Sequence, residues 1–282
     1  MRAGGRTVKF KLRVVAVVLV LFTFFSADLL AQTTAGEEMN LGVQAYRQAK
    51  YEKAIEHFER CVALAPENTI AHLYLATAYA QQYIPGAETP DNNRMAEQAI
   101  DQYQHVLDGN PVSSARINSA KGIAYLYLQM KKFDDSKKYY HMAADLDPDD
   151  PESYYSMGVI DWTICYQARQ EARARLGMKP DGSLAARDKN VCAEVREKNG
   201  ANVQEGIDNL NKALKLRPDY DDAMAYMNLM YRERADIQCG DPAARAADLK
   251  TADEWVDKTM ATKKAKANKA DRSSEPATTN PQ

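Results

Sequence analysis

One pattern recurs four times along the chain and limits its fold more than any other feature. In each copy a small residue is followed, at steps of three or four, by an aromatic or large apolar residue, a further small or apolar residue and then a proline. The copies span residues 54–66, 99–111, 136–148 and 206–218. Positions three and four apart lie on one face of a helix, so each copy predicts an amphipathic helix that the proline ends.

An apolar segment before each copy predicts the first helix of a pair. These segments contain Leu41, Gly42, Leu75, Ala76, Tyr79, Ile123, Ala124, Tyr127, Tyr154, Met157 and Gly158. Two antiparallel helices approach most closely where both side chains are small, because a larger side chain would separate them. We therefore expect Gly42 to face Ala54. By the same reasoning we expect Gly158 to face Gly206.

The combined pattern resembles the tetratricopeptide repeat (TPR) family, whose first helix carries an aromatic residue, Leu-Gly and Tyr and whose second helix carries Ala, Phe and Pro. The resemblance covers residues 35–262. It implies an all-α fold, a TPR-like right-handed α-solenoid of about five helix pairs. The first helices are then expected to line the concave side of the stack. The fifth pair is predicted over residues 221–237 and 242–261.

Two insertions lengthen the repeats beyond the roughly 34 residues usual in that family. The first, near residues 82–94, is rich in Pro, Gly, Asp and Asn, as loops are, and we expect Asn92 or Asn93 to cap the next helix. The second lies near residues 165–201. Its charged beginning predicts an extension of the first helix of the fourth pair, which Gly177 then breaks.

The two ends of the chain differ from its body. Residues 1–31 join a basic start to an apolar run and end in Ala31, which predicts a secretory signal peptide cleaved after that residue. An uncleaved membrane anchor is the alternative. The signal predicts an exported protein of bacterial type, periplasmic or secreted. Residues 263–282 are polar without an apolar period and predict a disordered tail.

Charge and motifs argue against several functions. The net charge of −2 combines +4 over residues 1–31, +3 over residues 263–282 and hence −9 for the body. Such a body does not favour nucleic-acid binding, which needs clustered Lys and Arg. No metal-binding motif includes the four histidines, His57, His72, His105 and His141. Acid pairs such as Asp149-Asp150 predict helix starts instead of acid–base catalysis. We therefore expect no metal, no cofactor and no enzymatic activity.

The four cysteines differ in their setting. Cys61 occupies a small position of the repeat and is expected to be a buried thiol. Cys165, Cys192 and Cys239 map to the edge where first helices turn into second helices, and export favours a disulfide there. We compare the heights of the cysteines above the small residue at which each helix is closest to its neighbour. At 1.5 Å per residue, Cys192 and Cys239 lie about 21 and 16 Å from that residue, whereas Cys165 lies about 10 Å from it. The more similar heights favour a Cys192–Cys239 bond. A kink at Gly200 would favour Cys165–Cys192 instead, and unpaired thiols are the remaining alternative.

The inward positions of the first helices predict a partner-binding surface. Counted from the small residue of each helix, they hold Tyr46, Leu73, Tyr74, Thr77, Tyr125, Leu128, Tyr155, Val159, Trp162, Tyr226 and Leu229. Polar groups on the same side are those of Lys121, Gln129, Arg232 and Glu233. Tyr and Trp give large contact areas with few rotamers, which suits binding, although packing between neighbouring helices is an alternative role. The paired Lys and Asn with which some TPR proteins bind a C-terminal carboxylate are not present.

Three functions remain open at this point. The first is an exported scaffold that binds another protein, as an extended peptide or a helix, in the concave aromatic groove. The second is a structural component of an envelope assembly that packs through its convex face and insertion. The third is an accessory module that binds a glycan or a lipid on the aromatic side chains. In each case no nucleic acid is expected, and contact with a membrane is expected only through an uncleaved N-terminal anchor.

Overall fold

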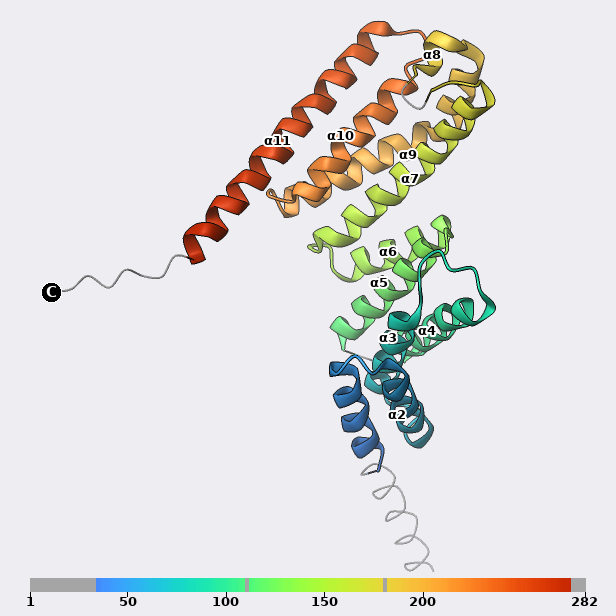
Figure 1. The fold of residues 1–282 in the computed structure, drawn as a ribbon, viewed down its shortest axis with the longest axis vertical. Coiled ribbons are helices and arrows are strands. Elements are labelled where there is room, and N and C mark those ends of the chain that lie inside the picture. The colour runs from blue at the N-terminus through green and yellow to red at the C-terminus, as the bar shows by residue number, and fades with distance from the viewer. Residues whose placement is uncertain (1–33, 110–111, 180–181, 275–282) are drawn as a thin grey trace, which may run out of the picture. The chain divides into compact units, whose positions relative to one another are not determined.

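A computed structural model describes residues 34–109, 112–179 and 182–274 of the chain. Within these ranges helices are joined by short turns, and no strand occurs. The chain forms two compact units, with the boundary between Met130 and Lys131 (Figure 1). The predicted all-α fold of TPR-like helix pairs is confirmed.

The N-terminal unit begins with a helix that is described over residues 34–47. It continues with α2 (Tyr51–Leu64), α3 (Thr69–Gln82), α4 (Pro90–Asp108) and α5 (Ser113–Gln129). Consecutive helices pack against each other, α3 between α2 and α4, and α4 against α5. The order therefore matches the first two predicted pairs followed by the first helix of the third.

The C-terminal unit begins with α6 (Phe133–Leu146), the second helix of the third predicted pair. It continues with α7 (Pro151–Arg175), the short α8 (Leu184–Arg187), α9 (Lys189–Leu216), α10 (Asp221–Asp236) and α11 (Pro242–Ser274). The pairs α7–α9 and α10–α11 lie side by side, and α10 also packs on α7 and α9 (Figure 1).

The recurring proline ends its helix in the predicted way. Three helices, α2, α6 and α9, stop two residues before Pro66, Pro148 and Pro218. A residue before proline avoids the helical region, because the proline ring collides with its backbone. The three intervening residues accordingly have φ between −142° and −132° and ψ between 74° and 88°.

Small residues allow the paired helices to approach closely. A Cβ atom added to Gly158 would lie 2.6 Å from Leu210 Cγ and 3.3 Å from the carbonyl oxygen of Gly206, so the predicted Gly158–Gly206 contact is present. At Gly42 the nearest atoms belong to the ring of Phe58, which fills the space beside the glycine. A larger residue at either glycine would push the helices apart.

The first insertion forms a loop from Tyr83 to Thr89, and its cap differs from the predicted one. Thr89 is the N-cap of α4, accepting a hydrogen bond from the Asn92 backbone N–H, and Pro90 occupies the first helical turn. The buried Asn92 side chain instead donates to the carbonyl oxygens of Ile84 and Ala87 and accepts from the Ile84 N–H. The prediction that Asn92 or Asn93 caps α4 is therefore wrong, because Asn92 closes the preceding loop.

The second insertion lengthens both helices of the fourth pair. Helix α7 extends to Arg175, and the chain then turns at Gly177, whose φ of +61° is readily adopted by glycine. Asp188 caps α9 by accepting hydrogen bonds from the N–H groups of Asn190 and Val191. Helix α9 then runs unbroken through Gly200, so the kink considered there does not occur.

The two ends of the chain were predicted to be a signal peptide and a disordered tail. The predicted signal peptide, residues 1–31, lies outside the described residues. Helix α11 continues through residues 263–274, where a disordered tail was predicted, while residues 275–282 lie outside the description. Alanine and lysine favour this helix, and Lys266 forms an ion pair with Asp221 on α10. Among the described helices, none is both long and apolar enough to cross a bilayer.

Candidate functional site

The ten residues predicted to bind a partner divide equally between the two units. The N-terminal unit holds Tyr46, Tyr74, Thr77, Lys121 and Tyr125. The C-terminal unit holds Tyr155, Val159, Trp162, Tyr226 and Leu229. In each unit some of these residues line one pocket, which we call the N-terminal pocket and the C-terminal pocket.

The C-terminal pocket lies among α7, α10 and α11 and has a volume of about 360 Å³. Its lining combines two predicted residues, Trp162 and Leu229, with Tyr166, Leu249 and a group of charged side chains. The charged side chains are Arg169, Arg173, Arg232, Glu233, Asp236 and Arg245. Arg232 and Glu233 were predicted as polar groups of this surface, whereas Arg169, Arg173, Asp236 and Arg245 were not.

Aromatic rings connect the pocket to the rest of the predicted surface. The ring centre of Trp162 lies 5.1 Å from that of Tyr166 and 5.4 Å from that of Tyr226. Tyr226 in turn lies 5.7 Å from Tyr155. Burial raises the pKa values of Tyr155 and Tyr226, so both phenols stay neutral and remain hydrogen-bond donors. These four rings form a continuous aromatic surface along one side of α7 and α10.

A buried ion-pair network forms the wall of the pocket. Arg169 donates to both carboxylate oxygens of Glu233, at 2.6 and 2.8 Å, and to Asp236 at 3.2 Å. Arg173 donates to the same oxygen of Asp236 at 2.9 Å. Burial raises the pKa of Glu233 and lowers that of Arg173, although both charges are paired. The sequence signal for this network is the spacing of four between Arg169 and Arg173 and of three between Glu233 and Asp236, which puts each pair on one helix face.

The N-terminal pocket also has a volume of about 360 Å³ and is lined mainly by predicted residues. Its lining consists of Tyr46, Leu73, Tyr74, Thr77, Tyr103 and Asn118. The hydroxyl groups of Thr77 and Tyr103 lie 3.3 Å apart. Tyr103 and Asn118 were not predicted, because Tyr103 belongs to a second helix and Asn118 lies three residues before Lys121, where the predicted surface on α5 begins.

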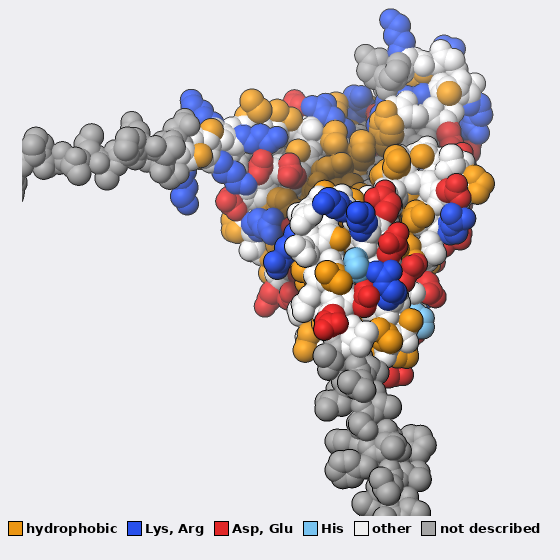
Figure 2. Space-filling view, turned by 60° about the horizontal axis from the view of Figure 1, so that its bottom comes forward, with side chains coloured by type: hydrophobic (Ala, Val, Ile, Leu, Met, Phe, Trp, Pro, Cys, Tyr) orange, Lys and Arg blue, Asp and Glu red, His pale blue; other side chains and the backbone are white. Residues whose placement is uncertain are grey.

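The remaining predicted residues line neither pocket. Lys121 and Tyr125 lie on α5, where Tyr125 is 46% exposed. Val159 lies on α7 and is half-buried. Tyr155 belongs to the aromatic surface through its ring contact with Tyr226. On the face shown in Figure 2, acidic and basic side chains are interspersed and do not gather into a stripe of one sign.

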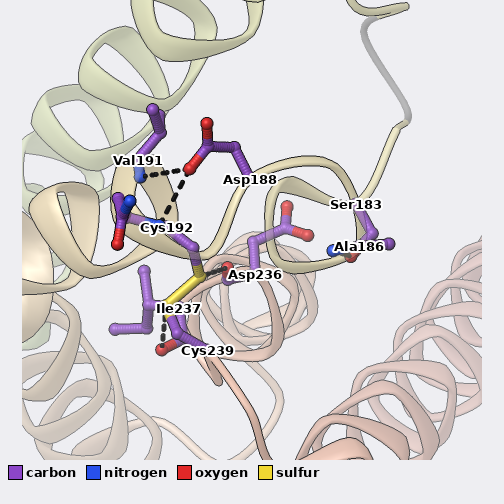
Figure 3. Close-up of a disulfide and its surroundings, with 9 residues drawn as sticks. Ser183, Ala186, Asp188, Val191, Cys192, Asp236, Ile237 and Cys239 are labelled. Atoms are coloured by element: carbon purple, nitrogen blue, oxygen red, sulfur yellow. Dashed lines mark hydrogen bonds between the residues drawn. A yellow bond between two sulfur atoms is a disulfide. The ribbon is translucent and has the colours of Figure 1, made fainter.

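The structure joins Cys192 and Cys239 in a disulfide, the pairing that the sequence favoured (Figure 3). The Cα atoms lie 5.7 Å apart, and the bond connects the first turn of α9 to the turn after α10. The backbone carbonyl oxygen of Asp236 lies 3.5 Å from the sulfur of Cys192. Cys61 and Cys165 are buried thiols, and burial raises the pKa of Cys165 to about 12, which keeps it protonated.

The histidines serve hydrogen bonding and packing. His72 contacts the Gln102 side chain and the Pro66 carbonyl oxygen through its two ring nitrogens, and its ring stacks on that of His105. His57 lies 2.7 Å from a carboxylate oxygen of Glu38. Among residues 34–109, 112–179 and 182–274, no group of three or more His, Cys, Asp or Glu side chains is arranged to hold a metal ion.

Two family models, each described as a tetratricopeptide repeat, match the chain at residues 38–68 and 122–150. No curated protein matches it.

Several solved structures are similar to most of the chain. A crystal structure of MamA protein has a TM-score of 0.55 and 13% identity, over 83% of this chain and 94% of that one. A structure of MamA from Desulfovibrio magneticus RS-1 has a TM-score of 0.54 and 15% identity, over 82% and 96%. The structure of YrrB, titled a TPR protein with an unusual peptide-binding site, has a TM-score of 0.51 and 13% identity, over 86% and 97%. At these identities the likeness shows the fold alone.

Proposed function

We propose that this chain, which contains tetratricopeptide repeats, is an exported, non-enzymatic scaffold that binds another protein as an extended peptide or a helix. In the C-terminal unit the proposed binding surface is the aromatic side of α7 and α10, and its centre is the C-terminal pocket. The observation that carries this proposal is the position of Trp162, which borders the pocket and connects it to the rings of Tyr166 and Tyr226.

The chemistry of the pocket supports a protein ligand. Aromatic and Arg side chains are the residues that contribute most binding energy at protein interfaces, particularly in pockets that exclude water. The C-terminal pocket provides both, with apolar groups from Trp162 and Leu229 beside guanidinium groups. YrrB, which shares the fold, is titled as having a peptide-binding site, which supports the same kind of ligand here.

Export is supported by two independent features. The sequence of residues 1–31 has the organisation of a signal peptide. The Cys192–Cys239 disulfide is of a kind that persists in oxidising compartments and is rare in the cytosol.

Site-specific photo-cross-linking in native cells tests the proposed surface. A photoreactive phenylalanine analogue replaces Trp162 or Tyr74, and in a matched control it replaces Val256, which is 39% exposed on α11 and lines neither pocket. We expect one protein to be captured from Trp162 and no adduct from Val256. Capture from Val256 alone would contradict the proposed binding surface. It would instead favour an assembly that packs through the outer surface of the helices.

A truncation measures how much the central ring contributes. Replacing Trp162 by Ala should weaken binding of the captured partner by about 2 kcal/mol or more, because central interface aromatics often have effects of this size. Circular dichroism should be unchanged, since Trp162 is only half-buried. Unchanged affinity in a folded Trp162→Ala variant would place the binding site elsewhere.

A further inference from the structure

The charges of the C-terminal pocket do not balance. Arg169 and Arg173 are matched by Glu233 and Asp236 within the pocket wall. Arg232 pairs with Asp253, at 2.7 Å, on the neighbouring α11. Arg245 lines the same pocket, and it forms no ion pair with any side chain in the described part of the chain. One positive charge is therefore left over.

Arg245 also has a buried donor with no acceptor. Its Nε atom is shielded from solvent, yet it makes no hydrogen bond within the described residues. The acidic residues nearest to Arg245 in sequence are engaged elsewhere: Asp241 accepts from the Ala244 N–H and Asp248 from the Arg234 side chain.

The size of the unmatched charge selects the kind of anion. The pocket wall already contains the carboxylates of Glu233 and Asp236, which would repel a doubly charged group such as a phosphate monoester. A carboxylate carries a single charge, and its two oxygens match the planar fork of a guanidinium. The neighbouring Trp162 and Leu229 would contact the apolar part of the same ligand.

From these observations we propose that the C-terminal pocket binds a carboxylate of the partner protein, held by Arg245. This assignment rests on the proposed peptide-binding function and gives that function a chemical preference. The carboxylate comes either from a Glu or Asp side chain or from the C-terminus of the partner. Both sources present the same group to Arg245.

Three pools of fluorescent nine-residue peptides with random flanking positions separate these sources. The first pool has a central Glu and blocked ends, the second a central Gln and blocked ends, and the third a central Gln with a free C-terminal carboxylate. Binding to the purified full chain is followed by fluorescence anisotropy. The variants are Arg245→Gln, Arg245→Lys and the control Arg187→Gln, which removes an exposed charge on α8 outside the pocket.

We expect the pool with the matching carboxylate to bind on the order of tenfold more tightly than the blocked Gln pool, as a charge-assisted hydrogen bond to Arg provides. Arg245→Gln should abolish this preference, Arg245→Lys should retain part of it, and Arg187→Gln should leave it intact. Circular dichroism verifies that each variant is folded.

The contrary results are distinct. Equal binding of all three pools by the wild-type chain would overturn the carboxylate assignment but leave peptide binding in place. A preference that survives in Arg245→Gln would also overturn it. If no pool binds, the proposed function and the carboxylate assignment fail together.

Discussion

The disulfide between Cys192 and Cys239 allows a quantitative test of how the long insertion is stabilised. The perturbation is the double substitution Cys192→Ala and Cys239→Ala, which removes the bond without leaving an unpaired thiol. Alanine is chosen because Cys192 is fully buried, and a serine hydroxyl there would add the cost of burying a polar group.

The expected magnitude follows from the length of chain that the bond encloses. The two cysteines are 47 residues apart. In the chain-entropy model, closing a loop of this length removes about 14 cal/mol/K from the unfolded chain, or about 4 kcal/mol at 25 °C. A loss of that size should lower the melting temperature by roughly 8–16 °C in a protein of about 150–250 residues.

Urea unfolding followed by tryptophan fluorescence measures the change in unfolding free energy of the C-terminal unit. Both tryptophans of the chain, Trp162 and Trp255, belong to the C-terminal unit, so their fluorescence reports on it selectively. The control is a reducing agent, which should shift wild-type unfolding to match the double variant and leave the variant itself unchanged.

Thiol counting decides whether the bond forms at all. The unfolded, unreduced wild-type chain should expose two reactive thiols, Cys61 and Cys165, and four after reduction. Four thiols before reduction would refute the bond. Two thiols combined with an unfolding free energy that changes by less than about 1 kcal/mol on reduction would instead refute the entropic argument.

Three further predictions address packing, protonation and processing. Gly158→Ala should destabilise the chain by about 1–3 kcal/mol in urea unfolding, because its Cβ would meet Leu210, whereas Gly200→Ala, with no atom within 4 Å, should stabilise it by about 0.5–1 kcal/mol. Burial raises the pKa of Asp161 to about 6, so the folded chain binds a proton more readily than the unfolded chain. The unfolding free energy of the wild type, relative to that of Asp161→Asn, should therefore rise as the pH falls from 6 to 4. A constant difference in unfolding free energy over that range would contradict this. Mass spectrometry of the protein from native cells should show a chain that begins at Gln32, and an intact Met1 would indicate an anchor.

The helix pairs could be predicted because their signals are local. The steps of three and four, the small residues at close contacts and the terminal prolines each act within one or two turns of helix. Gly158 and Gly206 were matched correctly because antiparallel helices have only one closest approach. The Cys192–Cys239 pairing could be predicted for the same reason, because the number of residues along a regular helix fixes the distance along its axis.

The missed features depend on which groups meet in three dimensions. Asn92 was expected to cap a helix, but Thr89 and Pro90 start α4 three residues earlier, which frees Asn92 to close the loop. The role proposed for Arg245 could not be deduced from its neighbours in sequence. Asp236 pairs with Arg169 and Arg173 on α7, and Asp253 pairs with Arg232 on α10, so neither pairing is encoded within one helix.

The insertion and the disulfide together explain why the charged pocket lies in the fourth and fifth pairs. Helix α7 contributes Trp162 within its regular length, but Arg169 and Arg173 belong to the extension that the insertion provides. These arginines meet Asp236 at the end of α10, and Cys239 fixes the following turn to the start of α9. The repeat pattern therefore supplies Trp162 and the carboxylates of Glu233 and Asp236, while the insertion supplies the two arginines that pair with them. A protein with the same repeats but without the insertion would keep the rings of Tyr155, Trp162 and Tyr226 and lose the ion pairs of Arg169 and Arg173.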